Sequence, residues 1–180
     1  HRHLMAFYRV AVQSLRRERD LEPVAKYLDE AERAALADVA LRHYVLLAWV
    51  SRRLDAIAKR GGIDNQRLML CDVNVTALTD AIGGCERIRN TPVPIAYAHH
   101  IKMFVTLFCF SVPFAMVGDM QLYTPLAVAV LAFALFGIDE IGVEIEEPFG
   151  YDPNDLALDQ MGDAIDKSLG DILRVGPKES

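Results

Sequence analysis

The sequence predicts an all-α membrane protein, in which a transmembrane helical hairpin is joined to helices that lie in the cytosol. Two observations predict this class. No Asp, Glu, Lys, Arg or His occurs between Lys102 and Asp119, or between Asp119 and Asp139, so two consecutive runs carry no charge. Almost every other patterned segment repeats its apolar residues at helical spacings of three and four, and no segment alternates convincingly as a strand would.

Four helices are expected before the hairpin. Residues 3–17 carry an apolar stripe at spacings of three and four, which is typical of an amphipathic helix. A second helix is predicted over residues 22–36, because its proline suits a first helical turn. Residues 41–60 and 64–82 predict two more helices, and each is followed by a pair of glycines that would end it.

The hairpin is predicted from the apolar runs 101–117 and 122–138, which the short link GDMQ joins. At about 1.5 Å per residue, a run of this length nearly covers a hydrocarbon core of about 30 Å. Pro113 lies inside the first run, and membrane helices tolerate such a kink when neighbours or water satisfy the freed carbonyl. The alternative is a buried helical pair in the core of a soluble protein.

The basic residues near the hairpin predict its orientation. Arg87, Arg89 and Lys102 precede the first run, whereas the link has no Lys or Arg. The positive-inside rule then places both ends of this chain in the cytoplasm. The predicted organisation is a cytosolic helical region over 1–98, a transmembrane hairpin over 99–138, and a cytosolic acidic turn and helix over 139–180.

Composition argues against several classes of function. Residues 1–102 hold 16 of the 19 Lys and Arg against 12 acids, and residues 103–180 hold 3 against 13. The basic residues alternate with acids at helical spacing, which is typical of solvated faces and not of nucleic-acid binding. The three cysteines have no metal-ligand spacing and favour a reducing compartment. The sequence contains no nucleophile elbow, phosphate-binding loop or HExxH motif, so no motif of this kind indicates an enzyme.

Residues 144–159 read EIEEPFGYDPNDLALD and follow the second apolar run closely. A helix is expected to continue from the membrane into water, and Pro148 and Gly150 are expected to end it in a sharp turn. Asp152 and Asp155 lie three apart in the loop that follows, where their oxygens could contribute to a calcium site. The alternative is that Asp155 or Asn154 caps the next helix.

Together with RIRNTPVPIAYAHHIK at 87–102 and the two apolar runs, the stretch 144–159 resembles the bestrophin family, in particular its bacterial members. The resemblance implies a subunit of a homopentameric ion channel in a bacterial inner membrane, in contact with membrane lipid. This chain would supply the last two of four transmembrane helices. The implied cargo is monovalent ions, chloride and other anions by family, with cation selectivity as an alternative for bacterial members.

The resemblance also implies a vestigial calcium clasp. Asp152 and Asp155 match the acidic positions of the clasp in animal members, and Glu144 and Glu147 match positions that give backbone carbonyls there. Here Tyr151 and two further non-acidic residues interrupt the acidic run of the animal proteins. No cofactor is therefore expected to be required, and calcium stays as an alternative.

A cytosolic constriction is the third feature that the resemblance implies. Counting back from Val93-Pro94 without gaps places its ring of side chains at Gln66, and Ile63 and Leu68 are the neighbouring candidates. An apolar ring would gate by dewetting, whereas a ring of Gln would stay wet.

The competing function for the whole protein is a membrane-anchored helical scaffold or regulatory subunit without a pore.

Overall fold

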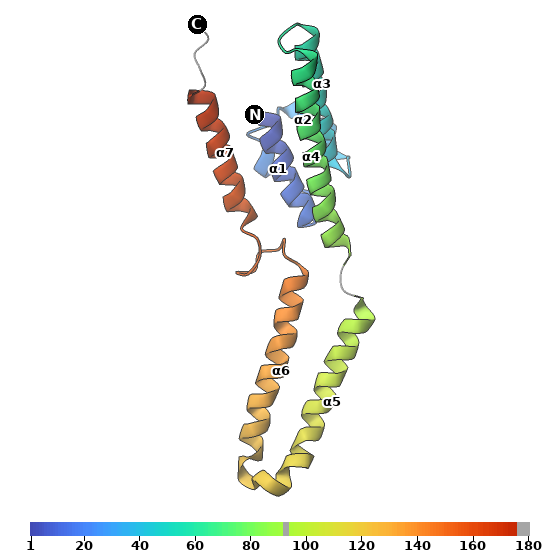
Figure 1. Ribbon diagram of the computed structural model, residues 1–180, viewed down its shortest axis with the longest axis vertical. Coiled ribbons are helices and arrows are strands. Elements are labelled where there is room, and N and C mark those ends of the chain that lie inside the picture. The colour runs from blue at the N-terminus through green and yellow to red at the C-terminus, as the bar shows by residue number, and fades with distance from the viewer. Residues whose placement is uncertain (92–93, 176–180) are drawn as a thin grey trace. The chain divides into compact units, whose positions relative to one another are not determined.

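The computed structural model describes residues 1–91 and 94–175, and every regular element within them is a helix (Figure 1). The predicted all-α class is therefore confirmed. The α-helices are α1 (Arg2–Leu15), α2 (Glu30–Ala37), α3 (Arg42–Lys59), α4 (Asn65–Asn90), α5 (Ile95–Met120), α6 (Thr124–Glu146) and α7 (Leu158–Val175), and two short 3₁₀ helices are η1 (Glu22–Val24) and η2 (Gln121–Tyr123).

The chain separates into two compact units, His1–Arg89 with Ala157–Ser180, and Asn90–Leu156. The predicted division into 1–98, 99–138 and 139–180 stays a prediction. Residues 92–93, which belong to the motif at 87–102, and residues 176–180 lie outside the described residues.

The core of the first unit forms around α1, which packs against α3. The apolar stripe predicted for residues 3–17 is the buried face of α1, and Met5 and Ala6 are completely buried. Leu46 of α3 and Leu36 at the end of α2 are also completely buried. Burial of a side chain the size of Met5, Leu36 or Leu46 stabilises the fold by roughly 1.5–3 kcal/mol.

Helix α7 is attached to the same unit by polar contacts. Arg9 pairs with Asp163, and Arg16 Nη1 lies 2.8 Å from Asp159 Oδ2. The Tyr8 hydroxyl donates to the Leu158 carbonyl at 2.8 Å. The two arginine side chains are only 13% and 7% exposed, but the carboxylates of Asp163 and Asp159 are 76% and 60% exposed, so solvent screens both pairs.

Two of the predicted helix boundaries are wrong. The helix expected over 22–36 is divided into η1 and α2, because Asp29 begins a new helix. Its side chain accepts from Glu32 N–H, and the Glu32 side chain accepts from Asp29 N–H, which together form a capping box. The helix expected to stop before Gly83-Gly84 continues to Asn90, and the contacts made by Glu86 and Arg89 lie on this continuation.

The second unit is a helical hairpin of α5 and α6 joined through η2 (Figure 1). The linking turn is shorter than predicted, because α5 continues to Met120 and Gln121 turns the chain at φ 44°. Pro113 lies inside α5 without ending it. Lys102 Nζ lies 3.8 Å from Asp139 Oδ2, which joins the two helices at the open end of the hairpin.

The hairpin carries its apolar residues on the outside. Within the continuous helical stretch Ile95–Glu146, the most apolar 18-residue window has a mean hydropathy of 2.1, and none of that window is buried. Phe110 and Phe114 of α5 are 71% and 72% exposed, and Phe133 of α6 is 83% exposed. A helical pair in a soluble core would be covered by other parts of the fold, and the described residues do not cover this pair. Lipid or other subunits must do so.

Candidate functional site

The segment after α6 is a closed turn that its own backbone stabilises. Leu156 N–H donates to the Pro148 carbonyl at 3.0 Å, and Asp155 N–H donates to the Asp152 carbonyl at 2.9 Å. Phe149 in this turn is only 4% exposed. The predicted end of the helix near Pro148 is confirmed, since α6 ends at Glu146.

The Asp155 carboxylate serves this turn. Its Oδ2 atom accepts from Asp152 N–H at 2.9 Å. A Cβ atom at Gly150 would lie 2.6 Å from the same oxygen, so a larger residue there would displace the Asp155 carboxylate from this position. Asp155 does not cap the next helix, because α7 begins only at Leu158. The capping alternative is thus wrong, and a turn within the loop takes its place.

The residues carried over from the calcium clasp have local partners. Glu144 Oε2 accepts from Asn154 Nδ2 at 2.8 Å, and Asp155 is bound within the turn. Glu147 follows the end of α6, and its side chain and that of Asp152 are exposed. Calcium takes six to eight oxygen ligands, and the parts of the chain that the structure describes hold no group of three metal-ligating side chains. These residues do not fit a calcium shell by themselves, and the clasp stays a prediction.

The candidates for the cytosolic constriction lie at the start of α4. Ile63 precedes the helix and is half-buried, Gln66 is exposed in the first turn, and Leu68 is half-buried. Asp64 caps this end, because its Oδ1 atom accepts from Arg67 N–H at 2.7 Å. Gln66 is therefore the candidate whose side chain is open to solvent in this chain, and the choice among the three stays a prediction.

Beyond its first turn, α4 exposes large apolar side chains. Met69 and Leu70 are 71% and 65% exposed, and Val73 is 58% exposed. The half-buried residues of this half recur at spacings of three and four on the opposite face, namely Leu68, Cys71, Val75 and Thr79. The helix therefore has one half-buried face and an apolar face that the described residues of this chain leave uncovered.

A buried histidine escaped the sequence analysis. His43 in the first turn of α3 is completely buried, and its Nε2 atom lies 3.2 Å from Glu86 Oε1 of α4. Tyr44 donates its hydroxyl to Glu86 Oε2 at 2.9 Å. Burial lowers the pKa of His43 below its usual value, although Glu86 acts in the opposite direction. No local pattern indicates this cluster, because its members come from two helices.

Comparisons of the sequence and of the structure with known proteins point to one family. Residues 1–171 match the family described as bacterial/fungal bestrophin protein. A protein from Synechocystis named as a voltage-dependent anion channel-forming protein is 36% identical over 97% of this chain. A Nostoc protein with the same name is 47% identical over 56% of this chain, which is 33% of that protein. A crystal structure of a bacterial bestrophin homologue from Klebsiella pneumoniae covers 98% of this chain, with 28% identity and a TM-score of 0.92.

The chain spans only part of these relatives. It covers 57% of the Synechocystis protein and 65% of the chain in the Klebsiella structure. The named relatives are described as channel-forming proteins. The resemblance seen in residues 87–102 and 144–159 is thereby confirmed at the level of the family.

Proposed function

The chain belongs to the bacterial and fungal bestrophin family, and from this membership we propose that it is part of a subunit of an ion channel that conducts monovalent ions across a membrane. The observation that carries the proposal is the hairpin Ile95–Glu146, whose apolar window is entirely unburied. The relatives' names favour anions, and the acidic residues after Ile138 would favour cations by their potential. Selectivity is therefore the first property to measure.

Homopentameric assembly is part of the proposal. A hairpin of two helices encloses no pore, so several copies must surround one. The exposed apolar face of α4, formed by Met69, Leu70 and Val73, offers a contact surface outside the hairpin. Exposed apolar surface of this kind is typical of a site that contacts another protein.

The proposed location is the bacterial inner membrane, with membrane lipid around the hairpin and both ends of this chain in the cytoplasm. Arg87, Arg89 and Lys102 on one side of the hairpin support that orientation. Neither nucleic acid nor a required cofactor is part of the proposal. The competing function is a membrane-anchored helical scaffold without a pore.

Planar bilayer recording of the full-length protein separates the channel from the scaffold. Unitary ion-selective currents are expected, and the reversal potential in a salt gradient gives the sign of the permeant ion. A protein that inserts into the bilayer, forms a stable oligomer and yet passes no current under any gradient would contradict the channel and support the scaffold.

A pair of variants at one position tests the assembly. Val73→Arg places a charge on the apolar face of α4, and Val73→Leu keeps the position apolar. Native mass measurement should show a pentamer for Val73→Leu and mostly lower oligomers for Val73→Arg, with both variants recovered from the membrane fraction. Equal pentamer content in the two variants would show that this face does not carry the subunit contact.

A further inference from the structure

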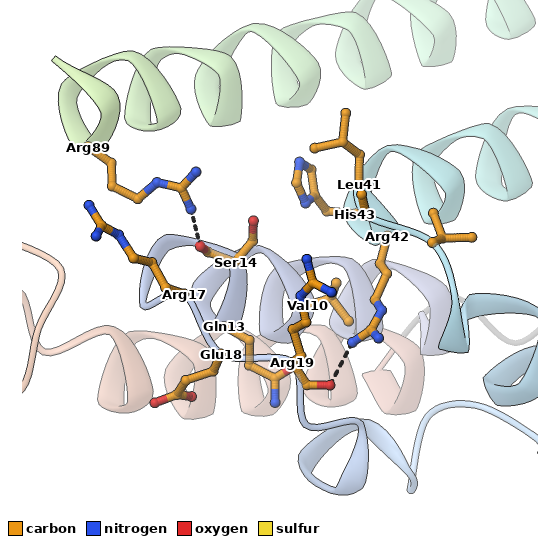
Figure 2. A pocket seen from close by; sticks show the side chains of 12 residues that line it. Val10, Gln13, Ser14, Arg17, Glu18, Arg19, Leu41, Arg42, His43 and Arg89 are labelled. Carbon is orange, nitrogen blue, oxygen red and sulfur yellow. Dashed lines mark hydrogen bonds between the residues drawn. The ribbon is translucent and has the colours of Figure 1, made fainter.

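A pocket of about 230 Å³ lies within the first unit, where the end of α1, the segment before α3 and the end of α4 meet (Figure 2). Four of its lining residues are arginines, Arg17, Arg19, Arg42 and Arg89, and Glu18 is the only acid among them. The pocket therefore has a net positive charge in a protein whose net charge is −6. Such a local excess of cations attracts anions.

Two of these arginines hold the walls together. Arg42 donates to the carbonyls of Arg19 at 2.7 Å, Leu36 at 2.9 Å and Ala37 at 2.7 Å. Arg89 donates to the Ser14 carbonyl near the end of α1. These bonds satisfy carbonyls that would otherwise repel an anion. They account for Arg42 and for one bond of Arg89, and they leave the role of the other two arginines open.

Arg17 and Arg19 are the two arginines whose guanidinium groups are not bonded to the walls of the pocket. Both side chains are exposed, and within residues 1–91 and 94–175 neither guanidinium makes a hydrogen bond or an ion pair. Arg17 has a left-handed backbone at φ 61°, at a helix end where glycine is usual. Its N–H donates to the Ser14 carbonyl at 3.1 Å, and Glu18 N–H donates to the Gln13 carbonyl at 2.8 Å. A residue other than glycine in this conformation carries a cost of backbone strain.

Uncharged donors also line the pocket. Helix α3 begins at Arg42, and its N-cap residue Leu41 supplies no side-chain bond to the first-turn N–H groups. The free N–H groups at the start of an 18-residue helix form a site for anions. Independently, Gln13 is only 7% exposed and its Nε2 atom has no hydrogen-bond partner. A buried donor without an acceptor is destabilising, and a bound oxyanion would supply the missing acceptor.

We propose that this pocket binds a phosphate group, held by Arg17, Arg19, the Gln13 amide and the first-turn N–H groups of α3. The volume is below the roughly 300–1,000 Å³ of pockets for drug-sized ligands, so the pocket suits a single small oxyanion. Guanidinium groups bind phosphate oxygens in pairs, which matches the free arginines. Inorganic phosphate and the headgroup of an anionic lipid share this chemistry, and Arg89 lies only a few residues before Ile95, where α5 begins.

Phosphate binding to the purified full-length channel tests the proposal directly. Equilibrium dialysis of radiolabelled inorganic phosphate against delipidated protein in detergent measures the dissociation constant, with sodium chloride adjusted to constant ionic strength. The variant Arg17→Gln with Arg19→Gln should bind at least about tenfold more weakly, because each charge-assisted bond contributes about 1.5–3 kcal/mol. The control is Arg52→Gln with Arg60→Gln, which removes the same charge from two other exposed arginines outside this pocket and should bind as the parent does.

A lipid arm identifies the source of the phosphate. The parent and both double variants are placed in nanodiscs of equal parts phosphatidylglycerol and phosphatidylcholine, and lipid retained after mild delipidation is counted by native mass spectrometry. Loss of inorganic phosphate binding in Arg17→Gln with Arg19→Gln supports a soluble ligand, and loss of retained phosphatidylglycerol alone supports a headgroup. If this variant and the control behave alike in both arms, the proposal is wrong.

Gln13→Leu distinguishes a binding role from a packing role. A leucine removes the unpartnered amide and keeps the position apolar, so the thermal midpoint should stay equal or rise while phosphate or phosphatidylglycerol binding falls severalfold. Unchanged binding in both arms with a raised midpoint would show that the amide is only a buried defect and would exclude it from the site. Neither measurement depends on ion conduction.

Discussion

The close approach of α7 to α1 gives a prediction whose magnitude follows from the structure. Gly162 is the point of contact, and a Cβ atom there would lie 2.7 Å from Tyr8 Cε1 and 2.9 Å from Arg9 Cζ. The tyrosine ring cannot withdraw without loss of its hydrogen bond to Leu158. Gly162→Ala should therefore loosen α7 from α1.

Gly170 of the same helix supplies the matched control, because nothing lies within 4 Å of a Cβ atom there. Alanine at either position gains the same roughly 0.5–1 kcal/mol of helix propensity. The difference between the two variants therefore isolates the steric cost, about 1–3 kcal/mol for an overpacked contact. In a local opening equilibrium this corresponds to about 5- to 150-fold.

Hydrogen–deuterium exchange of the full-length protein measures this opening for the amides of α7 alone. We expect faster exchange throughout α7 in Gly162→Ala and slower exchange in Gly170→Ala, with unchanged exchange in α5 and α6. Equal exchange of α7 in the two variants would show that α7 does not pack against Tyr8 and Arg9 as described, and the polar attachment of α7 would then need another explanation.

Three further predictions concern the turn, the buried histidine and the hairpin. Asp155→Ala should lower the free energy of unfolding by about 1 kcal/mol through loss of the bond to Asp152 N–H, whereas Asp152→Ala should change it by less than about 0.5 kcal/mol; equal thermal midpoints, or loss of a calcium response in either variant, would contradict this. His43 has a lowered pKa when folded, so unfolded chains bind the proton first and stability should fall as the pH drops below about 6.5, by at most about 1.4 kcal/mol per pH unit. His43→Phe should flatten this slope in thermal scans from pH 7.5 to 5.5, and an unchanged slope would assign the dependence to other groups. Phe110→Arg should reduce recovery in the membrane fraction, because arginine in the middle of a span costs about 2.5–3.5 kcal/mol, whereas Phe110→Leu should insert normally; equal recovery would place this part of α5 outside the membrane.

The sequence predicted the parts of the fold that depend on local pattern. The stripe in residues 3–17 and the apolar face of 41–60 became α1 and α3, and both charge-free runs became helices of the hairpin. These helices are long and strongly periodic, so many residues in each segment predict the same secondary structure. The capping box of Asp29 and Glu32 is also a local sequence signal, since a side-chain acceptor and a glutamate three residues apart mark a helix start.

Long-range contacts decided the features that the sequence did not reveal. Gly83 and Gly84 would weaken an isolated helix by about 1 kcal/mol each. The bond from Tyr44 to Glu86 lies beyond them on α4 and helps to stabilise the helix through both glycines. The arginine pocket likewise joins segments from three parts of the chain, and only its folded geometry shows that Gln13 lacks a partner.

Exposure has different meanings on α4 and on the hairpin. Both Asn65–Asn90 and Ile95–Glu146 are long and apolar enough to cross a membrane, and the mean hydropathies of their most apolar 18-residue windows are 1.2 and 2.1. The apolar half of α4, however, carries Asp72 and Asp80, and an aspartate in the middle of a bilayer costs about 2.5–3.5 kcal/mol. The charge-free runs of the hairpin, residues 103–118 and 120–138, carry no such cost. Charge therefore favours lipid as the cover of α5 and α6, and a neighbouring protein subunit as the cover of α4.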